Sequence, residues 1–217
     1  MNERAPEHQL DRSERKERTR RALLDAALEL VGEHGMAGLG LREVCRQAGI
    51  VPGAFYRHFR TLEELGLALV EESFESLHGL LREARANMAA TGDVLEGSVD
   101  VLVAHVAAHR AHLRFIARER VGGVPTIRQA IRLEIRLFTS ELATDLARLP
   151  VVSSWATDDI NLLAELIVQT IVHAVEALLD VPPGRPEQVE AVARQVVRQV
   201  RLIVVGVAGW RSRASGG

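Results

Sequence analysis

The sequence predicts an all-α protein of about nine helices, with a helix-turn-helix unit near the N-terminus and a larger helical domain behind it. Apolar residues recur at helical spacing through most of the 217 residues, and no segment alternates apolar and polar residues as a half-buried strand would. Two short helical segments meet at Gly49, which is typical of a helical corner. Two long apolar segments close the chain and indicate a pair of helices with more than one neighbour.

The first helix is expected over residues 13–34, where the apolar residues share one face and Gly35 follows at a typical stop position. A short second helix, about 41–48, ends where the glycine of the corner begins. The apolar positions of these two helices are Leu24, Ala27, Leu28 and Val31 in the first and Leu41, Val44 and Ala48 in the second.

The third helix is expected to open at Pro52, because a first-turn residue needs no backbone N–H. Phe55 and Phe59 lie one turn apart and are expected to face the core, which leaves the residues between them outside.

The remaining helices follow from capping and periodicity. Thr61 and Glu64 form a capping box, which predicts a fourth helix over roughly 62–89. Five more helices are expected at 94–108, 110–121, 125–148, 157–180 and 186–211. The predicted domains are a disordered tail at 1–12, a helix-turn-helix domain at 13–60, a second helical domain at 61–211 and a disordered tail at 212–217.

Charge and composition narrow the class of protein. The net charge is −2, yet residues 12–21 hold six basic and two acidic side chains, which suits contact with a polyanion at one end. A single cysteine excludes a disulfide scaffold. The charged N-terminus is unlike a secretion signal, and no uninterrupted apolar run approaches the roughly 18 residues of a membrane span. We therefore expect a cytoplasmic protein without a membrane partner.

The third helix has the chemistry of a DNA-reading element. Small residues at its start let the backbone approach a groove, Tyr56 and His58 offer donors for phosphate oxygens, and Arg42 suits a phosphate or a guanine. The alternative is a helical corner that binds nothing. The candidate DNA-contacting residues are Arg42, Val51, Pro52, Gly53, Ala54, Tyr56, Arg57, His58, Arg60 and Thr61.

Residues 39–69, LGLREVCRQAGIVPGAFYRHFRTLEELGLAL, resemble the DNA-binding domain of TetR-family repressors in the turn REV-x-R-x-AGI and the following YRHF helix. The resemblance implies that the first three helices contact a palindromic operator in double-stranded DNA. Many members have a lysine just after the recognition helix, where this chain has Thr61-Leu62. That phosphate contact would then fall to Arg60 or to the N–H groups that begin the fourth helix.

Further segments are similar to the FabR/DesT branch of this family. They are YRHFRTLEELGLALVEES, LLREAR, residues 114–123 and residues 174–181, and the likeness extends over most of 14–210. Members of that branch repress genes of unsaturated fatty-acid synthesis and bind long-chain acyl thioesters. The resemblance implies a repressor of lipid-metabolism genes with an acyl-CoA or acyl carrier protein thioester as effector, and leaves open whether the effector tightens or releases DNA.

The two terminal helices are expected to form a homodimer. Each is apolar on more than one side, so a second chain is the simplest partner beyond its own domain, although burial within a monomer is the alternative. A dimer would hold two recognition helices about 34–36 Å apart, the spacing of successive major grooves. The candidate interface residues are Leu166, Leu178, Val192, Val196, Val200, Ile203 and Val207.

The family resemblance places the effector between the fourth helix and the dimer helices. With only 4% aromatic residues, such a cavity suits a flexible acyl chain better than a flat, charged drug. Arginines near residue 119 are candidates to clamp an anionic headgroup, or alternatively to bridge helices with Glu119. The candidate ligand residues are Leu113, Phe115, Ile116, Arg118, Arg120, Ile135, Phe138, Val168, Ile171 and Val175, with Ile131 and Leu142 beside them.

The sequence predicts no enzyme, cofactor or metal site. His105, His109 and His112 have metal-ligand spacing, but the resemblance places a helix break near His109 that would separate them. Cys45 lies within the turn motif, where packing is its expected role. No phosphate-binding glycine loop and no nucleophilic triad is suggested. The alternatives to a lipid-responsive repressor are a TetR-type repressor of an efflux or catabolic operon and, more distantly, a helical acyl-binding protein or enzyme.

Overall fold

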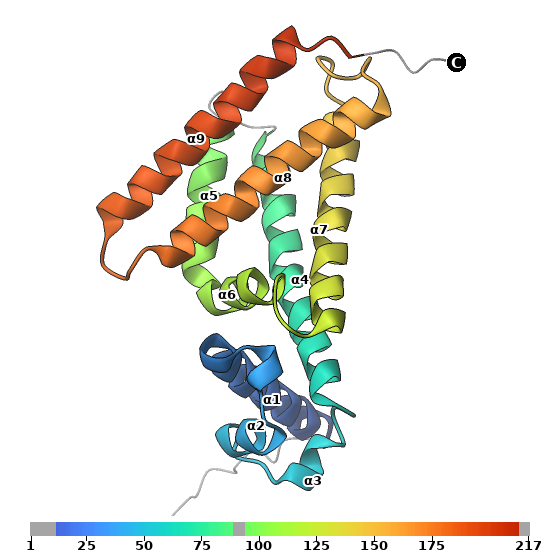
Figure 1. Ribbon diagram of the computed structural model, residues 1–217, viewed down its shortest axis with the longest axis vertical. Coiled ribbons are helices and arrows are strands. Elements are labelled where there is room, and N and C mark those ends of the chain that lie inside the picture. Colours follow the sequence, from blue (N-terminus) through green and yellow to red (C-terminus); the bar gives the residue numbers. More distant parts are fainter. Residues whose placement is uncertain (1–11, 89–93, 213–217) are drawn as a thin grey trace, which may run out of the picture.

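The computed structural model describes residues 12–88 and 94–212, and these residues form nine α-helices and no strand, as predicted (Figure 1). The predicted tails at 1–12 and 212–217 lie almost wholly outside the described residues. The elements are α1 (Arg12–His34), a 3₁₀ turn η1 (Met36–Gly38), α2 (Leu41–Gln47), α3 (Pro52–Phe55), α4 (Leu62–Met88), α5 (Val94–Ala108), α6 (Arg110–Glu119), α7 (Pro125–Leu146), α8 (Thr157–Asp180) and α9 (Pro186–Gly209).

Helices α1 to α3 form the N-terminal unit at one end of the molecule (Figure 1). The apolar face of α1 is buried as its periodicity predicts, with Leu23, Ala27 and Val31 fully inaccessible. Phe55 and Phe59 are 0% and 3% exposed, which confirms that the third helix turns these rings inward.

The turn between α2 and α3 is built around Gly49. The N–H of Gly49 donates to the carbonyl of Arg46, and the N–H of Ile50 donates to the carbonyl of Cys45. These two bonds form a Schellman motif, which requires the left-handed backbone that glycine adopts here at φ +69°. The motif fixes the angle at which the chain enters α3.

Helix α3 is shorter than the sequence suggests. Its regular part spans Pro52–Phe55, and residues 56–58 continue as tight turns in which the N–H groups of His58 and Phe59 still donate to the carbonyl of Phe55. Gly35 is the stop of α1, but its φ of +73° and ψ of 166° lead into the short turn η1, which the sequence did not predict.

The capping box at the start of α4 is confirmed, except that the Glu64 carboxylate accepts from the N–H of Arg60 and not from that of Thr61. The N–H of Glu64 donates to Oγ1 of Thr61 over 3.1 Å, and the carboxylate of Glu64 accepts from the N–H of Arg60 over 2.7 Å. The side chain of Arg60 adds a contact of 3.3 Å to the same carboxylate. Helix α4 therefore begins directly after the turns that follow α3.

The larger domain extends from α4. Helix α7 packs along α4, α8 packs against α7, α9 pairs with α8, and α5 lies against α9 (Figure 1). Helix α6 contacts α1 on one side and α4 and α8 on the other, so it lies between the N-terminal unit and the larger domain. The predicted bounds of α5 and α8 agree with the structure, whereas α6, α7 and α9 each end two residues early.

Helix α8 departs from the expectation about membrane-spanning segments. By length and composition it is apolar enough to cross a membrane, with a mean hydropathy of 1.8 over its most apolar 18 residues, of which 33% are buried. The sequence analysis did not predict a helix of this hydropathy, because polar residues such as Gln169 and His173 interrupt the apolar residues of α8. Helices α5, α6, α7 and α9 pack around α8 within the larger domain.

Candidate DNA-binding surface and ligand pocket

The predicted DNA-contacting residues lie together on α2, α3 and the adjoining turns, at the free end of the N-terminal unit (Figure 1). Val51 and Tyr56 are 71% and 61% exposed, although both are large apolar or aromatic side chains. No atom lies within 4 Å of a Cβ built at Gly53. Of the ten predicted residues, only Ala54 and His58 are half-buried, and the others are exposed.

His58 has a distinct environment at the base of this surface. Its Nδ1 is buried and has no hydrogen-bond partner. Burial lowers the pKa of His58, and the positive charges of Lys16 and Arg20 lower the pKa further. The ring is therefore neutral near pH 7.

Two basic residues of α1 lie beside the candidate DNA-binding surface, although they were not among the predicted contact residues. The guanidinium of Arg20 lies over the ring of Phe59 at 5.3 Å from its centroid. Lys16 lies one turn before Arg20, and both act on His58. The local excess of positive charge at residues 12–21 was the available signal, but it does not say which side chains face α3.

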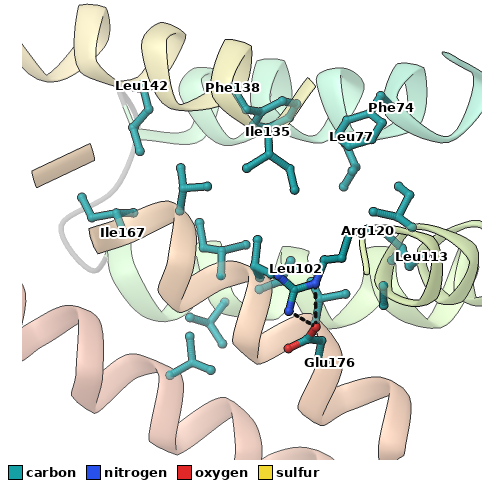
Figure 2. A pocket seen from close by; sticks show the side chains of 18 of the residues that line it. Phe74, Leu77, Leu102, Leu113, Arg120, Ile135, Phe138, Leu142, Ile167 and Glu176 are labelled. Carbon is teal, nitrogen blue, oxygen red and sulfur yellow. Dashed lines mark hydrogen bonds and ion pairs between the residues drawn. The ribbon is translucent and has the colours of Figure 1, made fainter. Parts of the chain in front are cut away.

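The larger domain contains an apolar pocket with a cavity volume of about 270 Å³. Helices α4 to α9 all contribute to its wall (Figure 2). Its lining residues are Phe74, Leu77, Ser98, Val99, Leu102, Leu113, Ile116, Ala117, Arg120, Ile135, Phe138, Leu142, Ile167, Val168, Ile171, Val172, Val175, Glu176, Val196 and Val200.

The structure brings eight of the ten predicted ligand residues to the pocket wall and places two elsewhere. Of the two exceptions, Phe115 is buried in the core at 2% exposure. Of the two neighbouring candidates, Leu142 lines the pocket and Ile131 is buried in the core at 0% exposure. Arg118 points away, and its Nη1 donates to the carbonyl of Gly32 in α1 over 2.9 Å. The contributions of α4 and α5, and Glu176 of α8, were missed because a contact between distant segments leaves no local pattern.

One ion pair interrupts the apolar wall. Nε of Arg120 donates to Oε1 of Glu176 over 3.0 Å, and Nη2 donates to the same oxygen. Figure 2 shows Arg120 extending among the lining side chains to Glu176 on α8. Each side chain retains 30% exposure. This pair corresponds to the bridging role that the sequence left open for an arginine beside residue 119, but with Glu176 as the acid.

Glu119 faces the opposite way from Arg120. Its side chain is 2% exposed, and its Oε1 accepts a hydrogen bond from the N–H of Met36 over 2.9 Å. Together with the bond from Arg118 to Gly32, this contact attaches the end of α6 to the end of α1.

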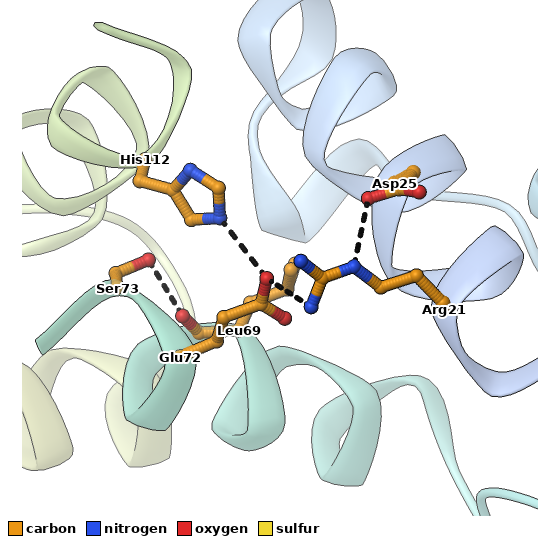
Figure 3. Close-up of polar contacts among 6 residues, drawn as sticks. All are labelled: Arg21, Asp25, Leu69, Glu72, Ser73 and His112. Carbon is orange, nitrogen blue, oxygen red and sulfur yellow. Dashed lines mark hydrogen bonds and ion pairs between the residues drawn. The ribbon is translucent and has the colours of Figure 1, made fainter. Parts of the chain in front are cut away.

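A second polar contact joins α1, α4 and α6 (Figure 3). Oε1 of Glu72 lies 2.7 Å from Nη1 of Arg21 and 3.5 Å from Nε2 of His112. Arg21 also lies 3.8 Å from Asp25 within α1. The N-terminal unit is thus connected to the pocket helices through charged groups as well as through apolar packing.

Comparison with known proteins matches the N-terminal unit to a family of regulators. Residues 23–69 fit the family model described as bacterial regulatory proteins, tetR family, and this segment spans the Schellman turn, α3 and the capped start of α4. This segment is therefore similar to the N-terminal domain of tetR-family regulators. This confirms the resemblance seen in residues 39–69.

Solved structures share the fold of this chain over most of both lengths. A transcriptional regulator from Aquifex aeolicus has a TM-score of 0.65 and 16% identity, covering 85% of this chain and 99% of its own. The fatty acid degradation regulator FadR from Bacillus halodurans has a TM-score of 0.63 and 18% identity, covering 90% and 97%. FadR from Bacillus subtilis in complex with stearoyl-CoA has a TM-score of 0.63 and 16% identity, covering 86% and 98%.

The predicted dimer residues divide between two faces. Leu166 is 49% exposed on α8, but Leu178 and Val196 are each 4% exposed, and Val196 and Val200 line the pocket. Val192 packs against the core, and Ile203 and Val207 are half-buried. Leu178 and Val196 therefore cannot reach a second chain, because their own domain already covers them.

The predicted histidine set does not assemble. Helix α5 ends before His109, whose ring lies 4.4 Å from that of His105, while His112 turns to Glu72. No group of three or more candidate metal ligands occurs among the described residues. Cys45 is buried at 1% exposure, and burial raises its pKa, so the thiol packs within the core of the N-terminal unit.

Proposed function

We propose that this protein is a TetR-family regulator that represses genes of fatty-acid or lipid metabolism in the bacterial cytoplasm and responds to a long-chain acyl thioester. The observation that carries the proposal is the pocket, whose wall is apolar except for Ser98 and the pair of Arg120 and Glu176. Such a wall suits an aliphatic chain. Structural neighbours described as fatty acid metabolism regulators support this effector class, and one of them holds stearoyl-CoA.

In a homodimer, the candidate DNA-contacting residues of each copy bind one half-site of the operator. In this proposal Tyr56, the neutral His58 and Arg57 bind phosphates, and the open backbone at Gly53 approaches base edges in the major groove. Lys16 and Arg20 add positive charge beside them. This arrangement predicts a palindromic operator with half-sites one helical turn apart.

The dimer is proposed to form through the outer faces of α8 and α9. Leu162 and Leu166 are 45% and 49% exposed on α8, and Leu202 and Val205 are 72% and 66% exposed on α9. These residues lie one turn apart on each helix, so they form apolar stripes that a second copy of the same pair can cover. Of the residues expected from the sequence, Leu166 belongs to this face.

The proposed switch is the last turn of α6. At this end of α6, Arg118 binds Gly32, Glu119 binds Met36 and Arg120 binds Glu176. A shift of this turn therefore acts on the pocket and on the end of α1 together. The cavity of about 270 Å³ is smaller than the roughly 300–1,000 Å³ usual for ligand pockets, so in this proposal a long acyl chain displaces the helices that line it. A differential affinity of about 1–3 kcal/mol between the two states is enough for regulation.

A repressor of an efflux or catabolic operon with another apolar effector is the alternative function, because the same apolar wall accommodates it. Neighbouring genes distinguish the two: a desaturase or fatty-acid synthase gene favours the lipid regulator, and a transporter gene favours the alternative.

The direct test is fluorescence anisotropy of the protein on DNA from upstream of its own gene, with palmitoyl-CoA, oleoyl-CoA or neither. We expect specific binding whose affinity changes differently with the two thioesters. Specific binding that neither thioester changes would remove the lipid effector and retain the DNA-binding regulator. Absence of specific binding to this DNA would contradict repression of its own gene region.

A further inference from the structure

The charged groups of the pocket wall cancel each other. Among the twenty lining residues only Arg120 and Glu176 carry charge, and they are paired on one oxygen, Oε1 of Glu176. The other oxygen, Oε2, lies 3.9 Å from Nδ1 of His173, which is 72% exposed outside the lining set. A ligand that enters the pocket therefore meets apolar surface and one neutral pair.

The pair retains hydrogen-bonding capacity on one side. Nε and Nη2 of Arg120 are used by Glu176, whereas Nη1 donates to no residue in the described part of the chain. A guanidinium carries five N–H donors, so the N–H groups of Nη1 are available to an acceptor on the ligand. The ligand can form this bond while Arg120 and Glu176 stay paired.

A ligand carboxylate and a ligand carbonyl would differ in the cost of binding beside Arg120 and Glu176. A free carboxylate would bring a second negative charge beside Glu176, where only one arginine serves both in an apolar surrounding. To bind Arg120 fully it would have to displace Glu176 and leave that charge without its partner. An uncharged carbonyl oxygen accepts from Nη1 without either cost.

We propose that the pocket selects an apolar molecule whose head is an uncharged carbonyl, as in a thioester, ester or amide, and that Glu176 excludes the free carboxylate of the same chain. This inference rests on the proposed apolar effector and specifies its head. Glu176 is then the specificity residue, and the regulator responds to an acylated conjugate and not to the free acid.

The test compares two probes with the same chain, decanoyl-N-acetylcysteamine thioester and decanoate, by isothermal titration calorimetry at pH 8. We expect the thioester to bind wild-type protein at least tenfold more tightly. Glu176→Gln keeps the shape and an oxygen acceptor for Arg120 but removes the negative charge. In this variant decanoate affinity is expected to rise at least tenfold, with little change for the thioester.

The matched control is Glu165→Gln, which removes a charge from an exposed position of the same helix, and it should leave both affinities unchanged. Thermal unfolding of each variant checks that the fold is retained. Equal or tighter binding of decanoate to the wild type, or an unchanged ratio in Glu176→Gln, would overturn the inference and leave the apolar effector standing. Failure of both probes to bind would overturn the inference and the proposed effector together.

Discussion

The carboxyl group of Glu119 accepts a hydrogen bond from the backbone N–H of Met36 over 2.9 Å, although 83 residues separate them in the chain. Met36 lies in the turn that follows α1, and Glu119 is the last residue of α6. The contact is buried, with Glu119 at 2% exposure and Met36 at 5%. It joins the N-terminal unit to a helix that also lines the ligand pocket.

Loss of the Glu119 acceptor should lower the free energy of unfolding. Glu119→Ala leaves the N–H of Met36 buried without a partner, which should lower the free energy of unfolding by about 1–3 kcal/mol in urea titrations. Glu119→Gln keeps an oxygen acceptor and should lose less. Glu75→Ala, exposed on α4, is the control. Equal stability of Glu119→Ala and the control would show that the contact contributes nothing.

Tyr56→Phe should weaken binding to every DNA sequence alike. The hydroxyl is 61% exposed with the rest of the side chain, so its removal should spare the fold and cost one phosphate hydrogen bond, about 0.5–1.5 kcal/mol or two- to tenfold in affinity. Anisotropy on the operator and on scrambled DNA measures both losses. A loss confined to the operator would contradict the phosphate role and indicate base contact.

The proposed dimer depends on the outer face of α9. Leu202→Glu places a charge at a 72% exposed position that the partner would bury, so sedimentation at micromolar concentration should show monomers. Leu133→Glu, at a 49% exposed position on α7, should leave the dimer intact. A dimer that persists in Leu202→Glu would place the interface elsewhere.

Acid should destabilise the protein through His105. Burial lowers the pKa of His105 below its ordinary 6.5, and the charge of His109 lowers the pKa further, while the buried Nε2 has no partner. The unfolded chain therefore binds the proton more readily, and this contribution to stability is fully present above pH 6.5 and is lost as the pH falls from there through the lower pKa of the folded protein.

The melting temperature of the wild type should accordingly fall between pH 7.5 and pH 5.5, and His105→Gln should reduce that fall. His34→Gln, at a side chain that is 50% exposed, serves as the control and should leave the pH dependence unchanged. An identical slope in all three proteins would exclude His105 as the source.

Local patterns predicted the fold well. The bounds of α8, the inward rings of Phe55 and Phe59, and the cap of Thr61 on Glu64 each depend on residues within a few turns of one another. The same locality explains why the candidate DNA-contacting residues lie together, as the sequence predicts. Their spacing is determined by one turn and one short helix.

The features that sequence could not provide depend on which distant segments meet. Helix α9 is apolar on two faces, so periodicity could not tell that Val196 lines the pocket while Leu202 faces outward. Arg118 and Arg120 are two residues apart on one helix, yet one reaches α1 and the other reaches Glu176 of α8. Their partners lie 86 and 56 residues away.

The central claim is that occupation of the pocket changes the affinity for DNA. Ile171→Trp should fill the cavity that Ile171 lines, and Leu133→Trp, exposed on α7, adds the same ring outside it. Operator affinity, measured by anisotropy with and without palmitoyl-CoA, should shift in the wild type and in Leu133→Trp and stay fixed in Ile171→Trp. An equal shift in all three proteins would contradict the account, because the effector would then act from somewhere other than this pocket.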